Sequence, residues 1–191
     1  LQSLDDVSDL TQEMSKTIEM FKDFFSFSKD KDKFKIIDTL NEYSNLITTA
    51  LKEQSVHLII TGDENIIFEG NKENFIQVMI NTINNAKEAV CKKSDIEKII
   101  LIDVKQNEHH VIEINLTDSG GGVSEEITQK IFEPYFSTKE DRNGTGLGLF
   151  IARKYVVNEF KGSIGTSNVH FEYEGEKYFG ANFKISLPFS E

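Results

Sequence analysis

The sequence contains a single cysteine, Cys91, which excludes an internal disulfide framework and is compatible with a reducing compartment. Basic residues are also few: 21 Lys and Arg stand against 32 Asp and Glu, and the formal net charge is −11. A chain this acidic is poorly suited to wrap nucleic acid by charge attraction. We therefore expect no nucleic-acid partner.

Long hydrophobic runs are missing as well. No apolar stretch approaches the length of about 20 residues that a membrane-spanning helix needs. No signal peptide opens the chain. We therefore expect a cytoplasmic segment without membrane contact of its own. The chain starts at Leu1 rather than at a methionine, so a membrane anchor upstream in the parent protein is compatible with this sequence.

The first 28 residues are expected to form one long helix and a separate unit. Positions from Leu4 to Phe25 follow alternating spacings of three and four residues, and all of them except Thr11 are apolar. This seam is typical of a helical hairpin or coiled coil, and a surface helix packed on its own domain is the alternative. A polar linker with alternating charge follows, and we place the domain boundary between residues 28 and 29.

Residues 29–191 are expected to form one α+β domain, in which a mixed sheet is covered on one face by three helices. The helices are predicted at about residues 39–53, 72–90 and 146–160, with Asp38 and Asn71 as caps of the first two. Strands are predicted at residues 34–36, 56–60, 66–68, 99–104, 111–116, 163–166, 169–173 and 178–187. The segments 56–60 and 66–68 flank a turn-like stretch and are interpreted as a pair of neighbouring strands.

The helix at residues 72–90 carries an apolar face at helical spacing and a polar face beside it. On the polar face, Asn81 and Asn85 lie only about 40° apart around the helix axis. An amide oxygen is a suitable ligand for Mg²⁺, and an amide nitrogen can donate to phosphate oxygens. A solvated polar face, which also includes Glu88, is the alternative interpretation.

Two glycine-rich segments follow this helix. The first, Asp118–Val123, comes directly after a predicted strand, and its three consecutive glycines would let the backbone approach a ligand closely. Asp118 could accept a hydrogen bond from the exocyclic amine of adenine, whereas an ordinary turn is the alternative. The second, Gly144–Leu149, leads into a helix whose N-terminal N–H groups could bind an anion. Its spacing matches neither a Walker A loop nor the dinucleotide-binding fingerprint.

The residues between the two glycine segments show little periodicity. They include Ile131–Lys139, a stretch that is rich in aromatic residues, and Arg142. A structureless loop of this length inside a compact domain indicates a lid over a ligand. The aromatic side chains could dock on a nucleotide, anchor the loop to the core, or do both. Lys139 and Arg142 could contact phosphates.

Four motifs of this chain resemble those of sensor histidine kinases. Residues 81–86 (NTINNA), 118–122 (DSGGG), 132–136 (FEPYF) and 144–149 (GTGLGL) are similar to the asparagine, first glycine, phenylalanine and second glycine boxes, in the same order and spacing. The resemblance covers residues 34–191. It implies the Bergerat type of two-layer α/β sandwich, shared with gyrase, chaperone and mismatch-repair ATPases, and it implies ATP and Mg²⁺ as cofactors.

The resemblance also implies roles for single residues. Asp118 would recognise adenine, Asn85 would hold Mg²⁺, and Asn81 would lie against the phosphates. Lys139 would stand near the terminal phosphate, and Ala89 occupies a position where some relatives place an aromatic residue over adenine. The remaining nucleotide contacts implied are Gly120, Gly122, Phe132, Phe136, Gly144, Thr145, Gly146, Leu147, Gly148 and Leu149.

Residues 1–28 resemble the second helix of the family's dimerisation and phosphotransfer hairpin. The phosphoacceptor histidine of the family lies on the first helix, and none of His57, His109, His110 and His170 occurs in a matching context. The resemblance thus implies a catalytic portion that transfers the γ-phosphoryl group of ATP to a histidine absent from this chain. The parent protein would be a homodimer that signals to a response regulator.

Other functions of the same fold remain open. A self-contained ATPase would need a carboxylate to activate water, usually at the position of Asn81, and a neutral amide cannot act as a base. Glu88 is the candidate that could replace it. A serine kinase that binds sigma or anti-sigma partners would lack the helix of residues 1–28. A non-catalytic interaction module would bind nucleotide without transferring a phosphoryl group.

Overall fold

The computed structural model describes residues 31–189 apart from residues 139–144. The helix predicted at residues 1–28 and the boundary that follows it lie outside the described residues, so both stay predictions. None of the described helices is long and apolar enough to cross a membrane.

The five-stranded sheet is mixed. Its strand order is β2-β4-β5-β7-β6, and every neighbouring pair is antiparallel except β2 with β4. β1 and β3 form a separate two-stranded antiparallel sheet. The elements are β1 (Asp32–Lys35), α2 (Ile36–Glu53), β2 (Val56–Gly62), β3 (Ile67–Gly70), α3 (Lys72–Cys91), β4 (Lys98–Gln106), β5 (Val111–Asp118), the 3-10 turn η1 (Lys130–Phe132), α4 (Gly148–Lys154), the π-helical turn η2 (Tyr155–Glu159), β6 (Ser163–Tyr173) and β7 (Glu176–Pro188).

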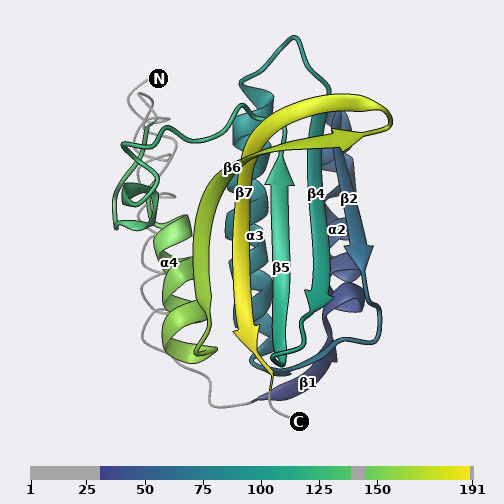
Figure 1. The fold of residues 1–191 in the computed structure, drawn as a ribbon, viewed down its shortest axis with the longest axis vertical. Coiled ribbons are helices and arrows are strands. Elements are labelled where there is room, and N and C mark those ends of the chain that lie inside the picture. Colours follow the sequence, from purple (N-terminus) through teal and green to yellow (C-terminus); the bar gives the residue numbers. More distant parts are fainter. Residues whose placement is uncertain (1–30, 139–144, 190–191) are drawn as a thin grey trace, which may run out of the picture. The chain divides into compact units, whose positions relative to one another are not determined.

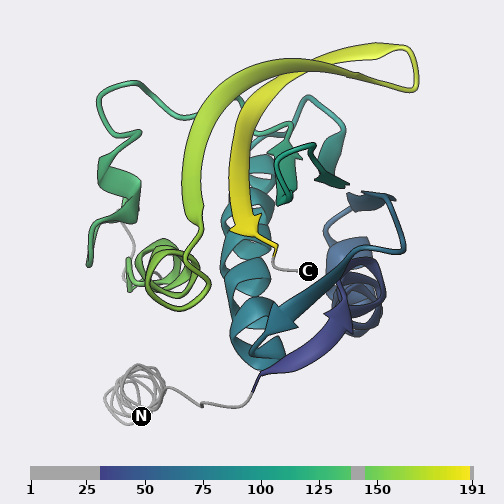
Figure 2. The ribbon, with the colours of Figure 1, turned by 60° about the horizontal axis from the view of Figure 1, so that its bottom comes forward.

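Helices α2, α3 and α4 lie on one face of this sheet, and none of the described elements covers the other, open face (Figures 1 and 2). The alternation along β5 shows why. Ile112, Ile114 and Leu116 are fully buried toward the helices, whereas the residues between them are half-buried and polar. A strand with one apolar and one polar face covers a core on one side only. The predicted α+β class, with a mixed sheet under three helices, is confirmed.

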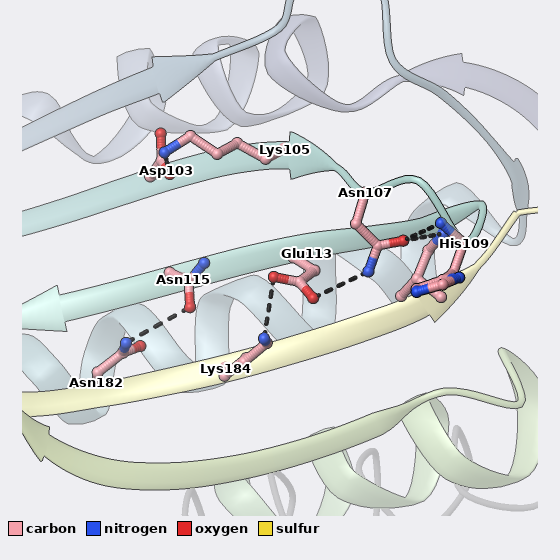
Figure 3. Close-up of polar contacts among 9 residues, drawn as sticks. Asp103, Lys105, Asn107, His109, Glu113, Asn115, Asn182 and Lys184 are labelled. Atoms are coloured by element: carbon pink, nitrogen blue, oxygen red, sulfur yellow. Dashed lines mark hydrogen bonds and ion pairs between the residues drawn. The ribbon is translucent and has the colours of Figure 1, made fainter.

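Polar side chains cover the open face of the sheet (Figure 3). Glu113 accepts a hydrogen bond from Asn107 at 3.1 Å and forms an ion pair with Lys184 at 2.9 Å. Lys105 and Asp103 form a second ion pair at 2.8 Å. Partly exposed pairs of this kind contribute little to stability. None of the residues predicted to bind nucleotide lies in this network.

Helix α3 runs behind the middle of the sheet (Figure 1). Its predicted N-cap is confirmed, because Asn71 Oδ1 accepts the Asn74 N–H at 2.8 Å. The buried stripe recurs at helical spacing and faces the sheet. It consists of Phe75, Val78, Met79, Thr82, Ile83, Ala86 and Val90. Asn81 and Asn85 therefore lie off the buried stripe, as predicted.

The predicted pairing of residues 56–60 with residues 66–68 is wrong. β2 pairs with β4, and β3 pairs with β1. The ring of Phe68 in β3 packs 5.9 Å from Phe34, 6.4 Å from Phe75 and 5.3 Å from Phe160, measured between ring centroids. This aromatic cluster attaches the small sheet to α3, so the two strands belong to different parts of the core.

Three smaller expectations also change. Helix α2 begins at Ile36, so Asp38 lies in its first turn rather than at the cap, where its charge still favours the helix dipole. The third helix begins at Gly148, and its last part is the π-helical turn η2. The segments predicted at 163–166 and 169–173 are one continuous strand, β6.

Candidate nucleotide-binding site

The first glycine segment lies directly against helix α3. A Cβ built on Gly120 would come within 2.6 Å of the Cβ of Ala89, so a larger residue at either position would separate the segment from the helix. The small side chain of Ala89 thus allows the backbone of the glycine segment to approach α3.

The second glycine segment meets the same helix further toward its N-terminus. A Cβ on Gly148 would come within 3.2 Å of Asn81 Oδ1. Gly146 has φ +64° and lies against the backbone of Tyr135 and Phe136, which joins this segment to the loop before it. Asn81 and Ala89 are eight residues apart on α3, a distance of about 12 Å along the axis. The helix therefore aligns the two glycine segments along one side.

Asp118 ends β5 in a fully enclosed position, with an exposure of only 1%. Its Oδ1 accepts the Gly120 N–H at 2.8 Å and the Ala181 N–H at 3.4 Å. Its buried Oδ2 has no hydrogen-bond partner among the described residues. Burial raises the pKa of this carboxyl from 3.8 to about 6, although the two backbone hydrogen bonds oppose the shift. A buried acceptor of this kind is suited to a ligand that brings a donor.

Asn81 also carries an unsatisfied buried atom. Its Nδ2 is buried and finds no partner in the described part of the chain, while Oδ1 points toward Gly148. Asn85 lies one helical turn along α3 and is half-buried. Asp118 is far from Asn81 and Asn85 in the sequence, but the fold brings the glycine segment that follows it against the helix that carries both asparagines.

The loop before the second glycine segment is anchored by Phe132. This side chain is 5% exposed, packs edge-on against Phe183 with 6.5 Å between ring centroids, and lies 5.7 Å from the guanidinium of Arg153. The anchoring role that the sequence left open is therefore observed. A contact of Phe132 or Phe136 with nucleotide stays a prediction.

The other predicted contacts differ in their placement. Leu147 and Leu149 are buried, Gly122 and Gly146 are half-buried, and Thr145 is exposed. Lys139, Arg142 and Gly144 lie outside the described residues, so their predicted contacts with phosphates are untested.

Sequence reasoning missed the residues that hold Asp118 in place. Gly180 in β7 lies where any Cβ would overlap the carbonyl oxygen of Asp118. An isolated glycine inside a strand indicates such a close approach, so the sequence did contain the signal. Ser119 is fully buried: its hydroxyl accepts the Ile99 N–H at 3.0 Å and donates to the Glu97 carbonyl at 2.8 Å. No local pattern indicates that contact.

A groove of about 450 Å³ lies elsewhere, between α2 and the edge strand β2. It is lined by Ser44, Thr48, Leu51, Lys52 and residues 55–59. None of the residues predicted to bind nucleotide contributes to it, so it is not the candidate site.

Comparison with known proteins identifies the family of this chain. The family model for histidine kinase-, DNA gyrase B- and HSP90-like ATPases matches residues 70–191. Sporulation kinase B of Bacillus subtilis (strain 168) is 33% identical over 159 residues, which are 83% of this chain and 34% of that protein. Sensor histidine kinase ZraS of Salmonella typhimurium is 29% identical over 152 residues, which are 79% of this chain and 30% of that protein.

Solved structures show the same architecture. The catalytic domain of histidine kinase ThkA superposes with a TM-score of 0.68 at 26% identity, over 83% of this chain and 95% of that one. This chain spans about a third of the length of the two curated relatives and nearly all of the isolated ThkA domain. The chain therefore belongs to the histidine kinase-, DNA gyrase B- and HSP90-like ATPases, as an ATP-binding domain of the sensor histidine kinase type.

Proposed function

We propose that this chain is the catalytic part of a sensor histidine kinase and transfers the γ-phosphoryl group of MgATP to a histidine elsewhere in its parent protein. The observation that supports this most strongly is a pair of buried, unsatisfied polar atoms, Asp118 Oδ2 and Asn81 Nδ2. One accepts and the other donates, and each lies beside one of the two glycine segments. They are complementary to the amine of adenine and to a phosphate oxygen, respectively.

Adenine would bind at the Asp118 end and the phosphates at the Asn81 end. The ionised Asp118 carboxylate accepts a hydrogen bond from the base, which fixes the nucleotide's orientation. Asn81, next to the Gly148 backbone, donates to phosphate. Its amide cannot remove a proton, so these residues bind and aim the phosphoryl group rather than activate water.

Asn85 fits a role in holding Mg²⁺. It lies one helical turn from both Asn81 and Ala89, between the proposed phosphate and adenine ends. Its amide oxygen is a hard donor of the kind that Mg²⁺ accepts alongside water and phosphate oxygens. When bound, the ion would neutralise phosphate charge. The further contacts that we propose are Gly120, Gly122, Phe132, Phe136, Lys139, Gly144, Thr145, Gly146, Leu147, Gly148 and Leu149.

The proposal includes partners and location. Histidine kinase ThkA has been solved in complex with the response regulator protein TrrA, and its fold matches this chain with a TM-score of 0.70. By analogy, we propose a receiver domain as the protein that accepts the phosphoryl group downstream. We further propose a homodimeric parent whose residues 1–28 belong to the phosphotransfer hairpin, and a cytoplasmic location for this segment.

The test is to mix this chain with Mg²⁺, γ-labelled ATP and a separately made hairpin of the same parent that carries the acceptor histidine. Label on the hairpin is the expected result. Bound ATP without labelled hairpin would contradict phosphoryl transfer, and absence of ATP binding would contradict the whole proposal. Steady ATP hydrolysis without acceptor, abolished in Glu88→Gln, would instead favour the self-contained ATPase.

A further inference from the structure

The β6–β7 hairpin extends beyond the five-stranded sheet. β5 pairs with β7 only over Asn182–Pro188, whereas residues 176–181 of β7 pair with β6 alone. The part of the hairpin whose two strands pair only with each other, residues 168–181, curves over the end of the sheet (Figure 1). We call it the hairpin extension. In this extension β7 no longer pairs with β5, and it contacts the first glycine segment instead.

Asn168 of the hairpin extension makes two hydrogen bonds to a single residue of that segment. Its Oδ1 accepts the Val123 N–H, and its Nδ2 donates to the Val123 carbonyl, both at 2.8 Å. A third bond runs from the Gly121 N–H to the Phe179 carbonyl at 3.1 Å. The backbone after Asp118 is thereby held in the way that a neighbouring strand would hold it.

Gly122 also lies against Asn168. Its φ is +79°, and a Cβ on it would lie 2.6 Å from Asn168 Oδ1. The left-handed backbone favours glycine there, and a Cβ would displace the Asn168 amide from its position against Val123. Gly122 was predicted to contact nucleotide. The structure adds a reason for this glycine that involves the protein's own hairpin.

We propose that Asn168 is a positioning residue of the nucleotide site: it holds the first glycine segment in the conformation that binds ATP. This inference rests on the proposed function, because it needs Gly120–Val123 to line the nucleotide. Three consecutive glycines have many accessible conformations, so ordering them is entropically unfavourable. If only a fraction of molecules holds the binding conformation, the apparent Kd rises by the reciprocal of that fraction. Asn168 keeps that fraction high before ATP arrives.

The position of Asn168 allows an effect on the glycine segment to be distinguished from an effect on overall stability. Its side chain is exposed, so removing it leaves the core intact. Asn182 offers a matched control in the same hairpin. Its amide faces the open side of the sheet and donates to Asn115 at 3.5 Å, away from the glycine segment (Figure 3).

The experiment compares Asn168→Ala, Asn168→Asp and Asn182→Ala with the parent chain. Calorimetry with ATP and ADP in the presence of Mg²⁺ gives Kd, and hydrogen exchange gives the protection of the Gly121 and Val123 amides. Two partly exposed neutral hydrogen bonds predict that Asn168→Ala raises Kd about 3- to 10-fold. Exchange at Val123 should accelerate while the melting temperature changes little. Asn168→Asp keeps the acceptor for the Val123 N–H but turns a carboxylate oxygen toward the Val123 carbonyl, so its Kd is expected to be at least as high as that of Asn168→Ala.

Each alternative outcome overturns the inference. An unchanged Kd in Asn168→Ala, with the parent binding ATP, would refute the positioning role and leave the proposed function standing. An equal loss in Asn182→Ala would mean that the hairpin acts only through general stability. If the parent itself binds no ATP, the proposed function fails and this inference fails with it.

Discussion

Replacing Asp118 by asparagine is expected to stabilise the folded protein while weakening its affinity for ATP. Burial raises the pKa of Asp118 from 3.8 to about 6. One pKa unit corresponds to about 1.4 kcal/mol, so ionising this carboxyl at pH 8 lowers the free energy of unfolding by about 3 kcal/mol. Asparagine avoids that cost, because it does not ionise.

The pH dependence follows from the direction of the shift. Because the folded-state pKa lies above the unfolded-state value, Asp118 stabilises the fold fully below pH 3.8, and this contribution is lost as pH rises toward 6. The asparagine would place an N–H₂ donor without a protein partner near the present position of Oδ2. This unsatisfied donor offsets about 1 to 2 kcal/mol of the gain in the free energy of unfolding. We expect a net gain of about 1–2 kcal/mol at pH 8 and no gain at pH 4.

The effect on ATP has the opposite sign. The Oδ2 acceptor becomes a donor that would face the amine donor of adenine, and a charge-assisted hydrogen bond is lost. A loss of about 1.5–3 kcal/mol corresponds to a Kd that is roughly 10- to 100-fold higher. Calorimetry with ATP and GTP measures this, and the preference for adenine over guanine should fall with the affinity.

Glu113→Gln is the matched control, since it also replaces a carboxylate by an amide on β5. A hydrogen bond from Lys184 lowers the pKa of Glu113, so the ionised form favours the folded state, and the change should slightly lower stability above pH 5. Urea unfolding at pH 4 and pH 8 compares the two variants. Asp118→Asn with the ATP affinity of the parent would refute base recognition, and no gain relative to Glu113→Gln at pH 8 would refute the burial argument.

Three further changes test the site and its supports. Asn85→Ala should weaken ATP binding only when Mg²⁺ is present, whereas Asn84→Ala at an exposed neighbour should not; equal calorimetric affinities would refute the metal assignment. Gly180→Ala should lower the free energy of unfolding by at least about 2 kcal/mol, while Gly165→Ala, with open space around it, should stay within about 0.5 kcal/mol in urea unfolding. Phe132→Ala should cost about 3–5 kcal/mol in the same assay, and a loss below 1 kcal/mol would contradict its core position.

The parts of the fold that local sequence determines were predicted well. Helix α3 follows from the spacing of its apolar residues, and Asn71 caps it as its residue type suggests. Strand β5 follows from alternation that runs directly into Asp118. The partner of β2 was not predictable in this way, because alternation says which face of a strand is buried but not which strand lies beside it.

For the candidate site, too, local sequence predicted some properties and the tertiary structure decided others. By itself, the sequence determined on which local element each site residue lies. The amides lie on one helix, the carboxylate lies at a strand end, the first glycine segment follows that strand, and the second leads into a helix. These are properties of short stretches, since helical periodicity and backbone freedom act over a few residues.

Only the tertiary structure decided the chemistry of those residues. The pKa of Asp118 depends on burial and on the Ala181 N–H, which is 63 positions away in the chain, and Val123 is held by Asn168, 45 positions away. Gly180 is required by the carbonyl of Asp118 rather than by its own neighbours in sequence. Desolvation and hydrogen-bond partnership arise from chain segments that meet only on folding, so no local pattern encodes them.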